Sequence, residues 1–249
     1  SSGMRRCKCT IVYDGTNFAG YQIQPDKRTV QLELEKVLLT MHKGREVKVA
    51  ASGRTDAGVH AKGQVIHFDS PLALPPERWK KALGTMLPAD IAIVDIEKVD
   101  SEFHARFNAV GKEYRYIISL AEVKDPFIRN YAYHYPYKLD LAMMERASEY
   151  LIGTHDFTSF CSAKTEVVDK VRTVKLIDFL KDDQQLVIRF VGDGFLYNMV
   201  RIMVGTLLDV GIGKRRPEEI KDIIAAHDRT KAGRTAPGHG LYLWKVDYK

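Results

Sequence analysis

Residues 53–60 of the chain read Gly53-Arg54-Thr55-Asp56-Ala57-Gly58-Val59-His60. Patterns typical of β-strands flank this octet, at residues 47–51 before it and at residues 63–69 after it. Asp56 is therefore expected in a tight, glycine-containing loop between two strands, and such loops often carry catalytic groups. The alternative is an Asx-type turn, in which the carboxylate only bonds to its own backbone.

Arg54 lies two residues before Asp56, so in an extended segment the two side chains point the same way. A guanidinium in that position could keep the carboxylate ionised or bind a phosphate group. The octet thus offers one candidate catalytic carboxylate and one candidate substrate-binding cation.

The first half of the chain alternates strand and helix patterns around the octet. Thr29 can cap the first helix, and Pro75-Pro76 can open the second, because proline is tolerated in a first helical turn. The expected elements are a strand at 6–13, a helix at 30–41, the two strands around Asp56, a helix that includes residues 79 and 83, and a strand at 91–96. This order resembles a split β-α-β unit of the ferredoxin-like type.

The second half begins near Arg106 and again alternates strand and helix patterns, with longer elements. Its expected elements are a strand at 112–120, a helix at 141–151 capped by Asp140, a hairpin of 171–180 and 185–191, helices at 197–210 and 217–227, and a strand at 240–248. No glycine- or serine-rich linker separates the halves, so we expect a continuous packed interface between them.

The predicted fold class is α+β, that is, mixed α/β. Two ferredoxin-like or RRM-like halves are expected to form a continuous, mostly antiparallel sheet, with helices on one face and an active-site cleft on the other. The predicted boundaries are 4–105 for the half that carries the Asp56 loop and 106–249 for the half that completes the cleft. Ser1-Ser2-Gly3, before Met4, is interpreted as an expression-tag remnant.

Arg201 is the only charged residue between Asp193 and Asp209. A helix that is apolar on most sides is largely buried, and a buried guanidinium needs a carboxylate, carbonyl oxygens or an opening to solvent. From the pattern alone, a structural ion pair with Asp193 or Asp209 competes with a role at a functional site.

The composition favours a polyanionic partner. The 249 residues include 38 Lys and Arg against 32 Asp and Glu, which gives a net charge of +6 and a pI near 9.1. Such a pI is a recognised indication of nucleic-acid binding, although an ordinary basic soluble protein has the same balance. The basic runs Lys80-Lys81 and Lys214-Arg215-Arg216 are expected to be solvated faces that could also contact phosphates.

Metal and membrane functions have no support in the sequence. Cys7, Cys9 and Cys161 fit no zinc spacing and are expected as small buried hydrophobic residues in a reducing compartment. The eight histidines form no metal-ligand motif, so His60 and His67 are interpreted as structural or as weak RNA contacts. No long apolar run or charged leader occurs, which favours a cytoplasmic location without a membrane span.

Several segments in a fixed order resemble one enzyme family over residues 4–249. The segments are residues 13–22, 52–61, 103–107, 112–116, 153–157, 195–201 and 233–237. They are similar to the tRNA pseudouridine synthase A family, in which residues 52–61 correspond to the catalytic loop. The resemblance implies isomerisation of uridines at positions 38, 39 and 40 of the tRNA anticodon stem-loop. The N-glycosidic bond breaks, the uracil turns, and C5 joins the ribose.

The resemblance also implies roles for individual residues. Asp56 would be the nucleophile and Arg201 its ion-pair partner, while Arg54 stays a candidate substrate-binding residue from its position beside Asp56. Tyr114 would stack on the flipped-out base and assist proton transfer, although an aromatic residue on a strand is more often simple core. No cofactor, small molecule or metal is implied, and the partners are tRNA and a second copy of the chain in a homodimer.

Two other functional classes were considered. A non-catalytic RNA-binding module of RRM-like topology would display bases on aromatic residues, but no strand carries the corresponding aromatic signature. A glycosidase that depends on Asp would need a second carboxylate as general acid, and the octet supplies only Asp56.

Overall fold

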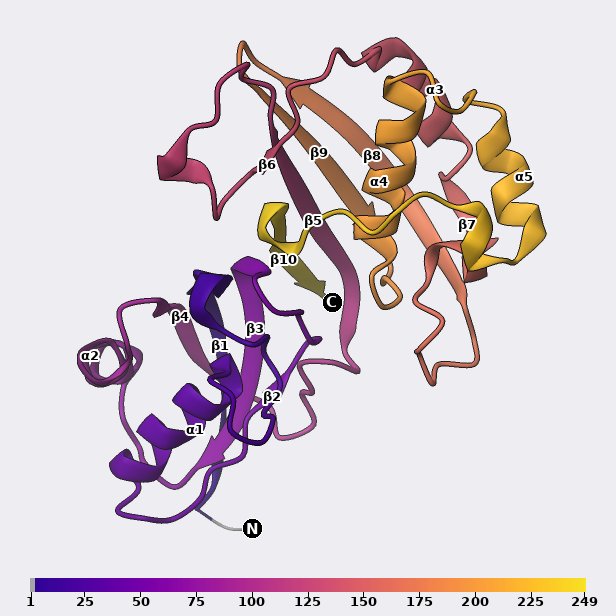
Figure 1. Cartoon of the computed structure of the whole chain (residues 1–249). Coiled ribbons are helices and arrows are strands. Elements are labelled where there is room, and N and C mark those ends of the chain that lie inside the picture. Colours follow the sequence, from indigo (N-terminus) through magenta and orange to yellow (C-terminus); the bar gives the residue numbers. More distant parts are fainter. Residues whose placement is uncertain (1–2) are drawn as a thin grey trace. The chain divides into compact units, whose positions relative to one another are not determined.

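The computed structural model describes residues 3–249 and divides into two compact units. The first unit contains the chain up to Val110 together with Tyr242–Lys249, and the second contains Gly111–Leu241. Strands and helices occur in both, and most strand pairs are antiparallel (Figure 1). The predicted mixed α+β class is therefore confirmed. Ser1 and Ser2, part of the expected tag remnant, lie outside the described residues.

The sheet of the first unit is built around β1 (Arg5–Tyr13). Its antiparallel neighbours are β3 (His60–Ser70) and β4 (Ile91–Val99), and Cys9 lies opposite Ile66 on one side and Ile96 on the other. The other edge of β3 pairs with the short β2 (Ala50–Ala51) and, in parallel, with β10 (Leu241–Tyr248).

Two helices complete the core of the first unit, α1 (Val30–Met41) and α2 (Pro76–Met86). Buried and half-buried residues alternate along β1, which is the pattern of a strand with one covered face. The Trp79 ring of α2 packs edge-on against Phe68 of β3, with ring centres 5.4 Å apart. Thr29 caps α1 as predicted, since its hydroxyl accepts the Leu32 amide at 3.3 Å.

The second unit has a sheet in the order β5 (Ala109–Ser119), β9 (Gln185–Gly192), β8 (Val171–Lys181) and β7 (Gly153–Asp156), all antiparallel. The two-residue β6 (Tyr133–His134) pairs in parallel with β5. Its helices are α3 (Leu141–Glu149), the almost completely buried α4 (Met199–Gly211) and α5 (Glu219–Ala226). The predicted hairpin and Asp140 cap are confirmed, because β8 pairs with β9 and the Asp140 carboxylate accepts the Met143 amide.

Some predicted boundaries were wrong for local reasons. The strand expected at residues 47–51 shrinks to β2, because Val47 and Val49 are buried but only Ala50 and Ala51 pair with β3. The helix expected from residue 197 begins at Met199, since Asn198 takes a left-handed conformation with φ 62°.

Candidate active site

The loop between β2 and β3, residues 52–59, holds Asp56 on a tight turn. The backbone oxygen of Asp56 accepts the Val59 amide at 3.1 Å, and Gly58 supplies the positive φ of 80°. Asp56 is half-buried, Thr55 is buried and Arg54 is exposed. The predicted loop placement of Asp56 is confirmed, and the exposed guanidinium of Arg54 is accessible to a large ligand.

A buried network of hydrogen-bonded polar side chains holds this loop in place. The Gln64 amide accepts the Ser52 hydroxyl at 2.6 Å and donates to the Gly53 carbonyl at 2.9 Å. The Tyr13 hydroxyl lies 2.7 Å from that of Thr55, and burial raises the pKa of Tyr13 to about 12, so that it stays protonated. Because buried polar groups are costly to leave without partners, this network fixes the loop backbone on both sides of Arg54.

The segment at residues 13–22 clamps the same loop through its backbone. The Tyr21 amide donates to the Thr55 carbonyl at 3.0 Å. Gly20 has φ 90°, and a Cβ there would lie 2.8 Å from the Thr55 oxygen. A Cβ on Gly15 would overlap the Val59 carbonyl. Two glycines of this segment are therefore required for the close approach that holds the Asp56 loop.

His60 and His67 are buried structural residues. The Nδ1 atom of His60 accepts the Gly15 amide at 2.9 Å, and that of His67 accepts the Ala105 amide at 3.0 Å. Burial, with a smaller effect of the Arg6 charge, lowers the pKa of His67 to about 4. Both rings therefore serve to position backbone segments.

Gln64 is the positioning residue that sequence patterns did not indicate. Replacing Gln64 by Leu should lower the free energy of unfolding by about 1–3 kcal/mol for each buried group that loses its partner. It should also slow the saturating rate of any reaction that depends on Asp56, because the loop that carries Asp56 loosens. Thermal melts and saturating rates test this.

The matched control is Ser70→Ala, which removes another buried hydrogen bond of β3, the 2.7 Å contact with His42 Nε2. Ser70→Ala should lower stability and leave the saturating rate unchanged. A Gln64→Leu protein that melts early but turns over normally would show that the network serves folding alone.

Tyr114 lies on β5 opposite Phe190 of β9. It is half-buried, whereas Tyr116 and Ile118, two and four residues further along, are completely buried. The Tyr114 ring meets Phe195 edge-on, with ring centres 5.3 Å apart and planes at 86°. Tyr116 and Ile118 are therefore core residues, as the strand pattern predicted, whereas Tyr114 on the same face is only half-buried.

Arg201 lies in the first turn of α4 and is half-buried. Its Nε donates to the Ala236 carbonyl at 2.8 Å, and a terminal nitrogen donates to Asn198 Oδ1 at 3.2 Å. The two carboxylates considered as structural partners are engaged elsewhere: Asp209 pairs with Arg215 at 3.0 Å, and Asp193 accepts the Thr173 amide at 2.9 Å. The Ala236 carbonyl and the Asn198 side-chain oxygen therefore help to hold the Arg201 guanidinium.

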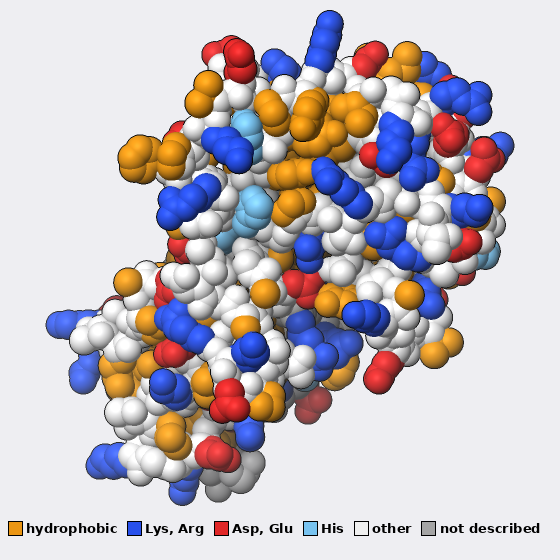
Figure 2. Space-filling model, in the orientation of Figure 1, with side chains coloured by type: hydrophobic (Ala, Val, Ile, Leu, Met, Phe, Trp, Pro, Cys, Tyr) orange, Lys and Arg blue, Asp and Glu red, His pale blue; other side chains and the backbone are white. Residues whose placement is uncertain are grey.

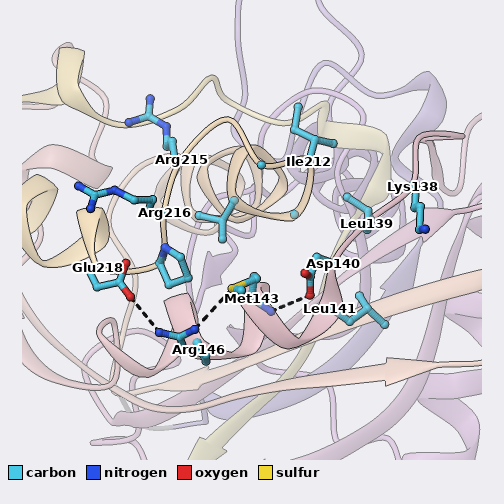
Figure 3. Close-up of a pocket in the computed structure, with 14 residues that line it drawn as sticks. Lys138, Leu139, Asp140, Leu141, Met143, Arg146, Ile212, Arg215, Arg216 and Glu218 are labelled. Atoms are coloured by element: carbon cyan, nitrogen blue, oxygen red, sulfur yellow. Dashed lines mark hydrogen bonds and ion pairs between the residues drawn. The ribbon is translucent and has the colours of Figure 1, made fainter.

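The four predicted site residues fall into both units. Arg54 and Asp56 belong to the first unit, and Tyr114 and Arg201 belong to the second. A surface pocket of about 880 Å³ in the second unit lies between α3 and the loop after α4 (Figure 3). None of the four residues lines this pocket.

Part of the predicted basic face at residues 214–216 lies at this pocket, because Arg215 and Arg216 line it. Arg215 is held by Asp209, whereas Lys214 and Arg216 are exposed. On the same rim Arg146 pairs with Glu218 at 2.8 Å (Figure 3). Lys and Arg side chains are spread over the face drawn in Figure 2.

Three further observations bear on the chemistry of the described residues, 3–249. Within this range no group of three or more His, Cys, Asp or Glu side chains could hold a metal ion. None of the helices found there is long and apolar enough to cross a membrane. The three cysteines are buried and free, and burial raises the pKa of the Cys7 thiol to about 11. Their prediction as buried hydrophobic residues is confirmed.

Comparison with known proteins identifies the class to which this fold and loop belong. The family model for tRNA pseudouridine synthase matches residues 10–108 and 147–249. The tRNA pseudouridine synthase A of Anoxybacillus flavithermus is 61% identical over 245 residues, which cover 98% of this chain and 99% of that protein. The protein of the same name from Bacillus subtilis is 59% identical over 244 residues, with 98% and 99% covered.

The structural neighbours are more distant. A crystal structure of the archaeal box H/ACA sRNP Nop10–Cbf5 complex matches with a TM-score of 0.37 and 12% identity, over 81% of this chain and 43% of that chain. This similarity carries no argument about function. The class is that of RNA pseudouridine synthases, which are isomerases. Within it, the chain belongs to the tRNA pseudouridine synthase family.

Proposed function

We propose that this chain isomerises uridines at positions 38, 39 and 40 of the tRNA anticodon stem-loop, with Asp56 as the nucleophile. The main observation behind the proposal is that other parts of the chain hold the Asp56 loop in place. A partly accessible carboxylate stands on a turn that is fixed by buried side chains and by the backbone of residues 13–22. A nucleophile needs this combination of access and fixed position.

The reaction exchanges one bond to the ribose for another. The Asp56 carboxylate attacks the target nucleoside, at C6 of the base or at C1′ of the sugar, and the bond between N1 and C1′ breaks. The uracil then turns, C5 bonds to C1′, and the bond to Asp56 is released. The proton on C5 leaves to solvent, and N1 takes up a proton in its place. Atoms and electrons balance without an oxidant, a reductant or an energy donor, in agreement with the expectation that no cofactor takes part.

The other site residues are assigned by chemistry. Arg201 is the cation that keeps the nucleophilic carboxylate ionised, and the engagement of Asp193 and Asp209 elsewhere supports that assignment. Arg54, exposed beside Asp56, binds tRNA phosphate. Tyr114 supplies a face for the base, which must leave its stack to react.

The proposed oligomeric state and cellular location are those that the family resemblance implies. We propose a homodimer that binds one tRNA across both copies, in the cytoplasm, with residues 4–105 carrying the nucleophile and residues 106–249 completing the cleft. A non-catalytic RNA-binding module is not favoured, because the family is one of enzymes and the Asp56 loop is present and rigidly supported. Sedimentation of the protein with and without tRNA tests the assembly.

Activity on unmodified tRNA is the direct test of the proposed function. Pseudouridine formation is measured by tritium release from uridine labelled at C5. Wild-type protein that binds tRNA and releases no tritium would contradict the proposal.

We expect full activity after exhaustive chelation with EDTA, because the reaction as proposed uses only the side chains of the chain. The measurement is the single-turnover rate before and after chelation, with tRNA refolded beforehand to remove effects of magnesium on the RNA. Loss of activity that one specific divalent ion restores would contradict this expectation.

A further inference from the structure

Residues 103–108, which include one of the family-like segments, display an aromatic side chain that the proposed chemistry does not use. Phe107 is 74% exposed, and its ring stacks on His104 with ring centres 4.2 Å apart and planes at 26°. Burying a phenylalanine side chain stabilises a protein by about 1.5–3 kcal/mol. The fold forgoes that gain at Phe107, which calls for an explanation.

The segment is rigid, so the exposure of Phe107 is not that of a loose loop. His104 Nδ1 accepts the amides of Arg106 and Phe107, at 3.1 and 3.3 Å. The His104 amide donates to Asn108 Oδ1 at 2.6 Å, and the Asn108 amide returns a bond to the His104 carbonyl. Completely buried Ala105 fixes the segment to β3 through its bond to His67. Phe107 is therefore held outward in one orientation, with its inner face on an imidazole.

One cation lies beside this stack, and two more lie at the adjacent Phe103. The Arg106 guanidinium lies 5.8 Å from the Phe107 ring centre. On the neighbouring β1, Arg6 donates to the Phe103 carbonyl at 2.6 Å, and the Lys8 ammonium lies 5.2 Å from the Phe103 ring. Exposed aromatic faces interleaved with arginine and lysine are the usual means of binding unpaired nucleotides, because every base can stack and every phosphate is anionic.

We propose that Phe107, backed by His104, is a stacking platform for an unpaired base of the tRNA, with Arg106 beside it for the adjoining phosphate. This proposal rests on the proposed function, since it takes tRNA as the substrate. The charge of the surroundings decides the occupant. The Arg106 guanidinium lies at the Phe107 ring, and two more cations, Lys8 and the Asp69-paired Arg6, lie at the adjacent Phe103, which suits a polyanion better than an apolar protein surface. Burial and the charges of Arg6 and Arg106 lower the pKa of His104, so its ring remains a neutral aromatic plane.

The test compares Phe107→Leu with Phe107→Trp. Leucine removes the aromatic face and tryptophan keeps it. With unmodified tRNA transcript as the probe, Phe107→Leu should bind roughly 5- to 150-fold more weakly, the range expected for one lost base stack. Phe107→Trp should bind like the wild type. The single-turnover rate at saturating tRNA should be unchanged in both.

Phe127→Leu is the matched control, because Phe127 is 87% exposed in the second unit and no ring contact is recorded for it among the described residues. It should leave tRNA affinity unchanged. Abasic substitution at single unpaired positions of the tRNA then locates the base: it should weaken binding to the wild type and cause no further loss in Phe107→Leu.

The outcomes separate this proposal from the proposed function. Unchanged affinity in Phe107→Leu, with pseudouridine still formed, would overturn the platform and leave the enzyme assignment standing. A change of oligomeric state in Phe107→Leu, seen by sedimentation, would overturn it in favour of a contact between two copies of the chain. Equal weakening by Phe107→Leu and Phe127→Leu would show a general loss of apolar surface and would also overturn it.

Discussion

Replacing Asp56 by Asn is expected to slow pseudouridine formation by roughly 10⁴- to 10⁶-fold, as removal of the nucleophile does in other enzymes. The affinity for tRNA should change little. The amide has the shape of the carboxylate but cannot form the covalent bond to the nucleoside. Affinity should persist because binding is spread over many basic side chains. The backbone bonds that hold the loop, from Thr55 to Tyr21 and from Asp56 to Val59, do not involve the altered group.

Tritium release from C5-labelled uridine measures turnover, and filter binding measures affinity. Asp182→Asn is the matched control, because Asp182 also sits in a loop between strands and its side chain accepts the Gln185 amide, which Asn can do equally well. Turnover by Asp56→Asn near that of the control would remove Asp56 from its proposed role.

The second large effect is expected at Tyr114. Tyr114→Phe keeps the ring, its edge-on contact with Phe195 and the stacking face, and loses only the hydroxyl. It should bind tRNA normally and react about 10²–10⁴-fold more slowly, if the hydroxyl moves a proton by general acid–base catalysis. Tyr114→Leu should also lose affinity, by the roughly 1–3 kcal/mol of a base stack.

Single-turnover rates and melting curves on both variants decide the role of Tyr114. Tyr116→Phe is the control on the same strand, since its buried hydroxyl donates to the Pro237 carbonyl at 2.6 Å. That control should lower the melting temperature without a matching loss of chemical rate. Unchanged chemistry in Tyr114→Phe would reduce Tyr114 to a platform, and Asp56 would keep its assignment.

The parts of the fold that could be predicted from the sequence are those encoded by neighbours along the chain. The stripe of α1 and its cap at Thr29 lie within four turns, and the β8–β9 hairpin needs only a short connection. Pairings between distant segments carry no such signal. The two-residue β2 and β6 are too short for any periodicity, and nothing in residues 240–248 indicated that β10 would pair with β3.

The candidate site divides in the same way. The octet and its flanking strands predicted the Asp56 loop, whereas the roles of Tyr114 and Arg201 came from resemblance to a family. The support of the loop could not be predicted, because Tyr13 and Thr55 are 42 residues apart and only the fold brings their hydroxyls together. Gln64 offered one indirect signal, an uncharged polar residue directly before the apolar pair Val65-Ile66 of a strand.

The pairing of β10 with β3 also sets the order in which the chain can fold. The first unit consists of residues up to Val110 and an eight-residue piece that follows the whole second unit. Closing so long a loop has an entropic cost, and non-local strand pairs form late and slowly. During synthesis, His60 at the end of the Asp56 loop has no Tyr242 ring against it until the last strand emerges. The Asp56 loop therefore gains its contact with β10 only after translation has passed through the second unit.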